Sequence, residues 1–423
     1  MDKFVIRGGK PLSGTVRVSG AKNASLALMP ATILATGQYK LSNTPNLRDV
    51  VTMSRLLESM GLHLAHRDHT MTIDSSHITN FEAPYEHVKK MRASIYVLGP
   101  LLGRFGQAKV SLPGGCAWGP RPVNLHIEGM KKLGAEIELE AGYIVAKSKR
   151  LHGARLLFDI SSVGATGNVL MAAVLAKGMT LIENAAMEPE IANLAEMLVK
   201  MGARISGIGT GRLEIEGVDE LHATDVETIP DRIEAGTLLV AGAIAGKRGE
   251  KIRLENCNPL HIGSIIVKLE DAGAKISVGK NFVELIPPTE IHPINATTAI
   301  YPGFPTDMQA QWIALMSLAN GTSLVTDTIY IDRFMHVPEL IRLGANITVK
   351  DNIATVFGAK KLSGAKVMST DLRASASLIL AGLAAEGTTE VLRVYHLDRG
   401  YEMVEKKLQL LGADISREKG EEF

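Results

Sequence analysis

The stretch VLMAAVLAKG at residues 169–178 decides the fold of this chain, because its pattern returns throughout the sequence. Nearly every residue before the glycine is apolar, which predicts a helix that is buried on most of its sides. The glycine ends that helix, and residues 180–183 (TLIE) predict a short strand. A second helix follows, in which Leu194, Leu198 and Met201 recur at helical spacing and predict an amphipathic surface.

Two series of glycines show that this pattern is one copy of a repeat of about seventy residues. One series ends the apolar stretches and the other ends the amphipathic stretches, and both have the same period. The first consists of Gly37, Gly106, Gly178, Gly249, Gly321 and Gly387, and the second of Gly61, Gly134, Gly202, Gly273, Gly344 and Gly412. Six strand–helix–strand–helix–strand–strand repeats predict an α/β protein with sheets outside a bundle of buried helices.

The six repeats divide into two halves, because three repeats make a domain of ordinary size and the chain of 423 residues is too long for one core. We place the break at residues 221–229. The first repeat lacks an opening strand unless residues 12–18 supply it, and the residues do not say which half that strand joins. An open solenoid is the alternative, but it needs polar end repeats that the sequence does not contain.

The composition excludes several classes of function. A net charge of +1, from 46 basic and 45 acidic residues, gives no general attraction for nucleic acid or an acidic membrane. The two cysteines, Cys116 and Cys257, lie far apart and form no metal-ligand pattern, and unpaired thiols fit a reducing cytosol. Residues 1–7 lack the apolar core of a signal peptide, and the apolar run at 235–246 is too short to span a bilayer. We expect a cytoplasmic protein without metal or cofactor.

The loop PGGCAWGPRP at residues 113–122 is the first candidate for chemistry. Glycine and proline fill half of it, which neither a helix nor a strand interior tolerates, so a mobile loop is predicted. The loop also makes the second repeat about four residues longer than the others, and insertions of this kind often carry function. Cys116 lies between glycines and near Arg121, where a thiol is placed to react. The alternative is a buried structural cysteine.

The starts of the six apolar helices are the second candidate, because polar or charged residues gather there. These starts are residues 22–25 (KNAS), 92–94 (RAS), 162–166 (SVGAT), 231–235 (DRIEA), 307–309 (DMQ) and 373–375 (RAS). Helix amino termini bind anions, so Lys22, Arg92, Arg121 and Arg373 would line a cationic cleft if the two halves face each other. Helix capping and exposed charge are the alternative explanation.

Two further residues complete the candidate set. Asp307 is the carboxylate we expect to act as a base, although an isolated aspartate at a helix start is often only a cap. Arg399 lies in a turn before the last amphipathic helix, in the register that Cys116 and Arg121 occupy in the second repeat.

Several motifs together resemble the UDP-N-acetylglucosamine 1-carboxyvinyltransferases, a family of enolpyruvyl transferases, over essentially the whole chain. They are residues 113–117 (PGGCA) with Gly119, Arg121 and Pro122, residues 20–23 (GAKN), 231–232 (DR), 303–309 (GFPTDMQ), 333–336 (RFMH), 371–374 (DLRA) and 398–401 (DRGY). The resemblance implies two inside-out α/β domains with pseudo-threefold symmetry. These are residues 22–229, with the mobile loop at about 112–125, and residues 1–21 with 230–423.

The implied reaction moves the enolpyruvyl group of phosphoenolpyruvate to the 3-hydroxyl of UDP-N-acetylglucosamine and releases phosphate through a tetrahedral ketal. It is the first committed step of bacterial peptidoglycan synthesis. The partners are thus two small molecules, with no nucleic acid, membrane insertion, cofactor or obligate protein partner. Enolpyruvyl transfer to shikimate 3-phosphate is the enzymatic alternative, and a catalytically silent scaffold that binds sugar nucleotides is the other.

The resemblance also assigns roles to residues. Cys116 would protonate the methylene carbon or form a covalent adduct, Asp307 would take the proton of the sugar hydroxyl, and Lys22 and Arg399 complete the catalytic set. Substrate contacts fall on Lys22, Asn23, Arg92, Arg121, Pro122, Val123, Asn124, Leu125, Ser162, Val163, Gly164, Asp307, Ile329, Arg373 and Arg399. The sequence departs from the usual family pattern at Trp118, Pro120, Asn124 and Ile160. A lysine often stands at position 160, so its absence makes Arg92 more important.

Overall fold

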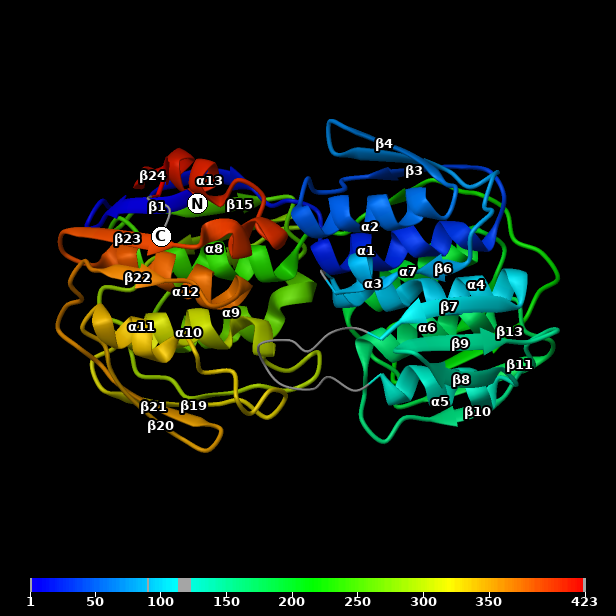
Figure 1. Cartoon of the computed structure of the whole chain (residues 1–423). Helices are drawn as coiled ribbons and strands as arrows, with labels where there is room; N and C mark the ends of the chain where they lie inside the picture. Colours follow the sequence, from blue (N-terminus) through cyan, green and yellow to red (C-terminus); the bar gives the residue numbers. More distant parts are fainter. Residues whose placement is uncertain (1, 90, 113–122, 421–423) are drawn as a thin grey trace. The chain divides into compact units, whose positions relative to one another are not determined.

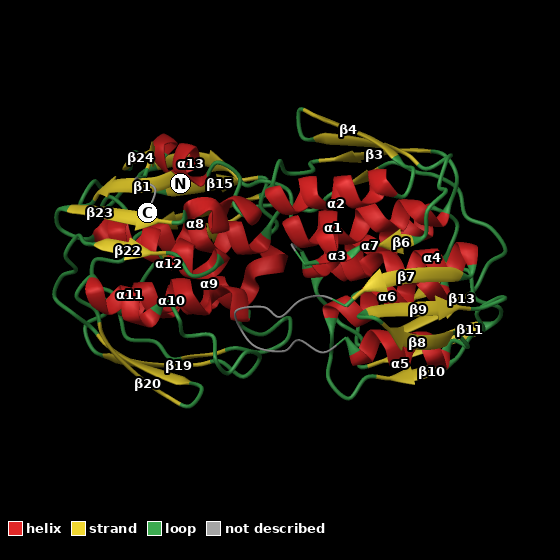
Figure 2. Cartoon of the chain, viewed as in Figure 1, coloured by secondary structure: helices red, strands yellow, loops and turns green. Residues whose placement is uncertain are grey.

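The computed structural model describes residues 2–89, 91–112 and 123–420 (Figure 1). The chain forms two compact units. Gly20–Ile229 make up one, which we call the inserted unit, and Met1–Ser19 with Pro230–Phe423 make up the other, which we call the terminal unit. Within each unit the strands lie outside the helices (Figure 2).

The inserted unit contains three four-stranded sheets. In spatial order they are β14 (Val226–Glu227), β3 (Gln38–Ser42), β5 (Thr70–Asp74) and β4 (His63–Arg67); β6 (Glu82–Ala83), β7 (Gln107–Ser111), β9 (Tyr143–Lys147) and β8 (Glu136–Glu140); and β10 (Arg155–Leu157), β11 (Met179–Glu183), β13 (Arg212–Glu216) and β12 (Arg204–Ser206). Its helices are α1 (Lys22–Ala31), α2 (Arg48–Ser59), α3 (Tyr85–Val88), α4 (Leu98–Phe105), α5 (Asn124–Lys132), α6 (Val163–Ala173) and α7 (Pro189–Lys200), with the 3-10 helices η1 (Thr32–Leu34) and η2 (Arg92–Val97).

The terminal unit repeats this plan with three more sheets. They are β16 (Lys275–Val278), β17 (Phe282–Ile286), β15 (Ile252–Glu255) and β2 (Gly14–Arg17); β18 (Ala296–Thr297), β19 (Thr322–Thr326), β21 (Ile353–Phe357) and β20 (Asn346–Lys350); and β22 (Lys366–Met368), β23 (Thr388–Leu392), β1 (Asp2–Arg7) and β24 (Asp414–Lys419). Its helices are α8 (Arg232–Ala245), α9 (Gly263–Asp271), α10 (Gln309–Met316), α11 (Val337–Arg342), α12 (Leu372–Ala384) and α13 (Val404–Leu410), with η3 (Pro259–Ile262), η4 (Thr306–Met308) and η5 (Val394–Arg399).

Each sheet has one parallel pair, between its short opening strand and the next strand, and its other pairs are antiparallel. In the third repeat Leu156 of β10 pairs in parallel with Ile182 of β11, and Ile182 pairs in antiparallel register with Leu213 of β13. A parallel pair needs a crossover connection, and the buried helix α6 provides it here. In this repeat the buried helix therefore connects two parallel strands of one sheet.

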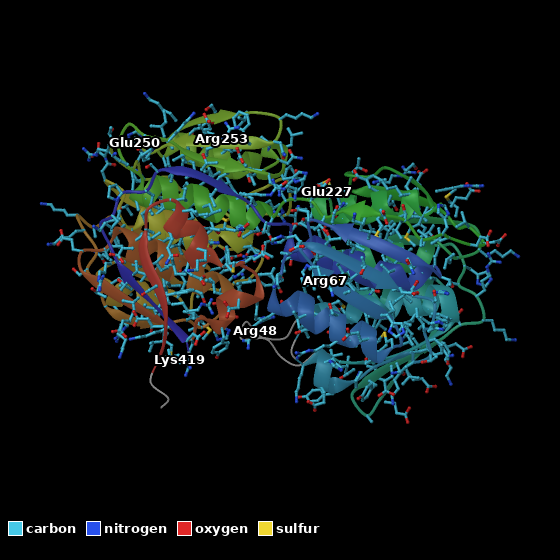
Figure 3. The ribbon with its side chains drawn as sticks, turned by 90° about the horizontal axis from the view of Figure 1, so that it is seen from above. Arg48, Arg67, Glu227, Glu250, Arg253 and Lys419 are labelled. Carbon is cyan, nitrogen blue, oxygen red and sulfur yellow. The ribbon has the colours of Figure 1, made fainter. Side chains whose placement is uncertain are left out.

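The apolar helices are buried as the sequence predicts. In α6 every residue from Ala165 onward is buried, and the same holds for α12 from Arg373 to Leu383. In the terminal unit α8, α10 and α12 pack against one another. Charged side chains such as Arg67, Glu250 and Arg253 lie on the strands and turns outside the helices (Figure 3). The predicted α/β fold with buried helices and outer sheets is confirmed.

The glycines of the second series end the amphipathic helices in the left-handed region. Gly134 follows α5 with φ +91° and Gly202 follows α7 with φ +108°, and the other four lie between these values. A residue with a Cβ adopts this conformation only at a cost, so glycine is the favoured helix terminator there. The period seen in the sequence therefore comes from the backbone geometry of the helix ends.

Three strands come from distant parts of the chain. β2 pairs in parallel with β15, so the strand that the residues alone leave unassigned opens the fourth repeat. The first repeat is opened instead by β14, which pairs in parallel with β3. β1 closes the sixth repeat between β23 and β24.

Ser19, the last residue of the terminal unit before the chain enters the inserted unit, is held by buried charges. Its backbone N–H donates to Glu234 Oε2 (2.6 Å) and its hydroxyl donates to Glu402 Oε2 (2.5 Å). Lys407 Nζ donates to the Ser19 hydroxyl (2.7 Å) and to Glu234 Oε1 (2.5 Å). Burial raises the pKa of Glu234, and the Lys407 charge opposes that rise. This network fixes the point at which the chain leaves the terminal unit.

Because Lys407 compensates a carboxylate that is 2 % exposed, we predict that Lys407→Met destabilises the protein by about 3–5 kcal/mol. Adding Glu234→Gln to this variant should restore most of the loss, since no uncompensated charge then remains. Urea denaturation provides the measurement. Lys361→Met is the matched control, because Lys361 and Glu386 form an exposed ion pair whose loss should cost at most about 1 kcal/mol. Equal effects of the two lysine substitutions would contradict the prediction.

Candidate active site

Asp307 lies between two arginines in the terminal unit. Its Oδ1 is 2.9 Å from Arg333 Nη2 and its Oδ2 is 2.9 Å from Arg373 Nη2. Both arginine side chains are almost fully buried, with exposed fractions of 7 % and 5 %, whereas 28 % of the Asp307 side chain is exposed. Asp307 and Arg373, which the sequence predicts separately as site residues, are therefore in contact. Arg333 is a third member that the list of predicted site residues lacks.

Local structure explains the placement of Arg373. Asp371 caps α12, and its Oδ1 accepts the backbone N–H groups of Arg373 (2.8 Å) and Ala374 (3.2 Å). Arg373 therefore occupies the first turn of a capped helix. Its guanidinium lies 5.3 Å from the ring centroid of Tyr401, whose hydroxyl is 2.8 Å from Thr237 Oγ1. Tyr401, between η5 and α13, therefore packs against the guanidinium and is itself held by Thr237 of α8.

Arg333 is positioned by the loop that precedes α11. Its Nη1 donates to Thr306 Oγ1 (3.0 Å), and its carbonyl accepts a hydrogen bond from Gln309 Nε2 (3.1 Å). Thr306 in turn donates to Asp327 Oδ2 (2.7 Å). Thr306, which precedes Asp307, therefore helps to hold the guanidinium that pairs with Asp307, and Gln309 holds the Arg333 backbone.

Opposing effects act on the ionisation of Asp307. Burial favours the neutral acid, but the charges and hydrogen bonds of Arg373 and Arg333 outweigh it and hold the pKa of Asp307 well below its usual range. The carboxylate is ionised at neutral pH. In this arrangement it is also a weak base, because both guanidiniums stabilise the charged form.

Lys22 begins α1 in the inserted unit and faces a buried carboxylate. Its Nζ is 3.2 Å from Oδ2 of Asp49, whose side chain is 4 % exposed. Asn23 follows it and is exposed. The cation predicted to hold substrate therefore has a fixed partner within its own unit.

The start of α6 gathers several predicted contacts of the inserted unit. Ser162 caps this helix by accepting the Ala165 N–H (3.3 Å), and Val163 and Gly164 form its first turn. His126 of α5 lies against Gly164 so closely that a Cβ there would approach its Cε1 and Nε2 to 3.1 Å. Burial, and the charge of nearby Arg92, lower the pKa of His126 to about 3. His126 is the second residue that the list of predicted site residues lacks.

The remaining predicted residues lie on several helices and loops. Val123 and Leu125 are half-buried and Asn124 is exposed at the start of α5, Ile329 is 37 % exposed after β19, and Arg399 is half-buried at the end of η5. Ile160 is 72 % exposed and brings no charge to the loop before α6. Cys116, Arg121 and Pro122 lie outside the described residues.

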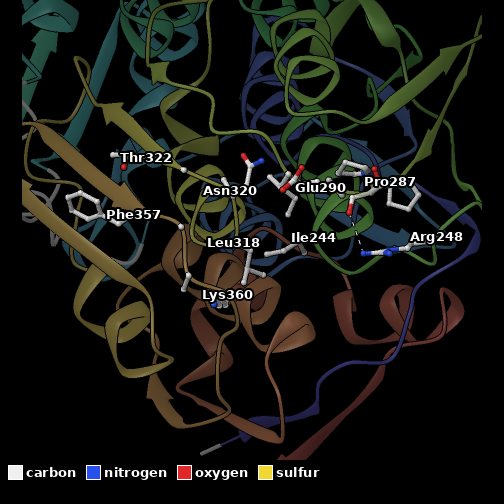
Figure 4. A pocket seen from close by; sticks show the side chains of 18 residues that line it. Ile244, Arg248, Pro287, Glu290, Leu318, Asn320, Thr322, Phe357 and Lys360 are labelled. Atoms are coloured by element: carbon white, nitrogen blue, oxygen red, sulfur yellow. Dashed lines mark hydrogen bonds between the residues drawn. The ribbon is translucent and has the colours of Figure 1, made fainter.

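A surface cavity of about 620 Å³ lies at the carboxyl-terminal ends of α8 and α10, away from the helix starts that carry the predicted site residues (Figure 4). Arg248, Glu290 and Lys360 contribute its charged groups. No predicted site residue lines it, and it adjoins helix carboxyl termini, whose dipoles disfavour anions. Among the residues that the structure describes, no group of histidine, cysteine and carboxylate side chains is arranged to bind a metal. Within the same ranges, no helix has the length and apolar character needed to cross a membrane.

Comparison with known proteins identifies the class. The sequence model of a family described as EPSP synthase (3-phosphoshikimate 1-carboxyvinyltransferase) matches residues 6–408. The structure also resembles the enolpyruvyl transferase NikO from Streptomyces tendae, with a TM-score of 0.89, 27 % identity and 98 % coverage of both chains. EPSP synthase from Acinetobacter baumannii has a TM-score of 0.77 at 17 % identity, with coverage of 99 % of this chain and 100 % of that one, and shares the fold. The protein is a transferase of the carboxyvinyltransferase class.

Relatives with higher sequence identity show to which family of carboxyvinyltransferases the chain belongs. The chain is 63 % identical over 426 residues to the UDP-N-acetylglucosamine 1-carboxyvinyltransferase of Chloroherpeton thalassium, covering 100 % of this chain and 99 % of the relative. It is 55 % identical to the protein of that name from Geotalea uraniireducens, with 99 % of each covered. The chain belongs to the UDP-N-acetylglucosamine 1-carboxyvinyltransferase family.

The low pKa of His126 generates a prediction about acid stability. The pKa of His336, in the terminal unit, is likewise lowered to about 3, by burial and by Arg333. An unfolded histidine binds its proton near pH 6.5. The folded state therefore binds fewer protons between these values, and stability is complete above pH 6.5 and falls as the pH decreases. From pH 7.5 to 5.5 each histidine should cost about 1.4 kcal/mol.

Urea denaturation at these two pH values tests this stability loss. His126→Gln should remove about half of the loss that the two buried histidines cause. His63 is exposed, so His63→Gln serves as the control for a histidine-to-glutamine substitution at the surface. An unaltered loss in His126→Gln would contradict the assignment of a neutral, buried ring.

Proposed function

We propose that this protein transfers the enolpyruvyl group of phosphoenolpyruvate to the 3-hydroxyl of UDP-N-acetylglucosamine and releases phosphate. The observation that carries the proposal is the 63 % identity, over nearly the full length of both chains, to a relative named for this transfer. We place the reaction at the first committed step of peptidoglycan synthesis. The substrates are two small molecules, and a cytoplasmic location follows from where such metabolites are made and used.

The reaction proceeds by addition and then elimination. The sugar hydroxyl loses a proton as its oxygen bonds to C2 of phosphoenolpyruvate, and a proton is added to the methylene carbon. The resulting tetrahedral ketal then loses that carbon's proton and the phosphate group. Cys116 would donate the proton to carbon or form a covalent adduct. Lys22, Arg121 and Arg399 would hold the phosphate and carboxylate by charge-assisted hydrogen bonds.

Asp307 would accept the proton of the sugar hydroxyl, and its partners suggest when it can do so. With both arginines in place the carboxylate is too weak a base, since its pKa is held well below the usual range. Phosphoenolpyruvate is itself an anion that competes for Arg373. When Arg373 turns to the substrate, Asp307 loses part of its stabilisation and its pKa rises. The base would therefore become active only after phosphoenolpyruvate has bound.

The UDP-sugar contacts are proposed at several sites of the inserted unit. The capped first turn of α6, formed by Ser162, Val163 and Gly164, would receive the diphosphate at its free N–H groups. Arg92 would add charge there, and Asn23 would orient the sugar. The remaining proposed contacts are Arg121, Pro122, Val123, Asn124 and Leu125 of the inserted unit and Asp307 and Ile329 of the terminal unit. We propose residues 22–229 and residues 1–21 with 230–423 as the two functional domains.

The experiment measures phosphate release from phosphoenolpyruvate with each of two acceptors, UDP-N-acetylglucosamine and shikimate 3-phosphate. We expect release with UDP-N-acetylglucosamine and only background release with shikimate 3-phosphate. The reverse preference would assign the chain to the shikimate branch of the family, and release with neither acceptor would support the catalytically silent scaffold. Asp332→Asn changes an exposed carboxylate and serves as an active control when variants of Asp307 are assayed.

A further inference from the structure

Asp327 is a completely buried carboxylate, directly after β19, that the proposed chemistry does not use. Its Oδ1 accepts the Thr298 hydroxyl (2.8 Å) and the backbone N–H groups of Ile329 and Tyr330 (2.9 Å each). Its Oδ2 accepts the Thr306 hydroxyl (2.7 Å). Four donors thus meet two oxygens. This pattern fits the charged carboxylate, because that form accepts hydrogen bonds and does not donate them.

The Thr306 hydroxyl links this carboxylate to Arg333, and the link can run in only one direction. A guanidinium can only donate, so the hydroxyl oxygen must accept the bond from Arg333 Nη1 (3.0 Å). The single proton of the hydroxyl therefore points to Asp327 Oδ2. Both bonds end on a charged group, which makes them stronger than bonds between neutral groups. Arg333 therefore lies between two carboxylates, with Asp307 in direct contact and Asp327 reached through one hydroxyl.

Each guanidinium beside Asp307 has a second carboxylate of its own. Asp327 is linked to Arg333, and the charge of Asp231 at the start of α8 acts on Arg373. Asp307 is thus shared by two cations that are each partly compensated from another side. Because of this arrangement, Asp307 can take up a proton without leaving either guanidinium wholly uncompensated.

Two titratable side chains beside these guanidiniums are neutral near pH 7. Burial, together with the charge of Arg333, lowers the pKa of His336 to about 3. Burial raises the pKa of Tyr401, whose ring lies beside Arg373. The ring of Tyr330 faces the Arg333 guanidinium at 5.6 Å, where a cation–π contact stabilises the cation. The carboxylates therefore provide the negative charge that the two guanidiniums meet.

We propose that Asp327 is a positioning residue for the proposed base, Asp307. Through the Thr306 hydroxyl it holds and partly compensates the Arg333 guanidinium, so that Arg333 draws less strongly on Asp307. The carboxylate of Asp307 is then available for the proton of the sugar hydroxyl. The inference rests on the proposed function, because it assumes that Asp307 is the base of enolpyruvyl transfer.

Asp327→Asn separates the charge of this residue from the bonds that hold its loop. The amide oxygen can still accept the three donors that meet Oδ1, whereas the amide nitrogen replaces Oδ2 and offers the Thr306 hydroxyl no acceptor. Thr306→Val removes the hydroxyl from the link, and Thr306→Ser keeps it. Asp332→Asn is the matched control, because it removes one negative charge from an exposed side chain. Steady-state kinetics with phosphoenolpyruvate and UDP-N-acetylglucosamine gives kcat, KM and their pH dependence, and circular dichroism verifies folding.

We expect Asp327→Asn to lower kcat about tenfold, because Arg333 then draws more strongly on Asp307 and makes it a weaker base. Loss of a nearby negative charge lowers the pKa of Asp307. The acid limb of the kcat profile should therefore move to lower pH, and the KM for phosphoenolpyruvate should not rise. Thr306→Val should lower kcat as well, whereas Thr306→Ser should retain most of it. The double variant of Asp327→Asn and Thr306→Val should be no slower than its slower single variant, since both changes break one link.

The inference is overturned if folded Asp327→Asn keeps kcat within twofold of the unaltered protein or matches Asp332→Asn. An acid limb that moves to higher pH would also overturn it, because Arg333 would then merely have moved away from Asp307. Losses that multiply in the double variant would show two independent effects and contradict the link. If Asp327→Asn does not fold, equal kcat values for Thr306→Val and Thr306→Ser overturn the inference. A failure of the proposed function differs, because the unaltered protein would then release no phosphate with UDP-N-acetylglucosamine.

Discussion

The contact of Asp307 with Arg333 and Arg373 is the interaction on which the candidate active site of the terminal unit depends. It joins η4, the loop before α11 and the first turn of α12, which are far apart in the sequence. One carboxylate pairs with two nearly buried guanidiniums and compensates part of the charge of both. The same carboxylate is the proposed base, so the proposed chemistry and the stability of the site both depend on the Asp307 side chain. An anionic substrate that competes for Arg373 would shift this group from its structural role to its catalytic role.

Both units use the amino termini of buried helices to present polar groups. The repeat brings a capped helix start to each site, as Asp371 does for α12 and Ser162 does for α6. Side chains from outside each helix lie beside these starts. Arg333 contacts Asp307, which also pairs with Arg373 of α12, and His126 lies against Gly164 of α6. The repeated scaffold thus carries different side chains beside equivalent helix starts.

The sequence predicts the architecture because the features that produce it are periodic. Terminating glycines such as Gly134 and apolar stretches such as residues 169–176 recur because backbone geometry and burial require them in every repeat. It does not predict that β14 opens the first repeat, since strand pairing across the chain leaves no local signal. Charge and motif predict single residues of the candidate site. The roles of Arg333 and His126 depend on partners that only folding brings near them.

The most direct test of this account is the affinity of Asp307→Asn for phosphoenolpyruvate, measured by calorimetry alongside the Asp332→Asn control. If the carboxylate competes with substrate for the guanidiniums, the neutral amide should release Arg373 and strengthen binding by about tenfold while turnover is lost. Circular dichroism establishes that the variant is folded. Binding that is unchanged or weaker in folded Asp307→Asn would contradict the central claim.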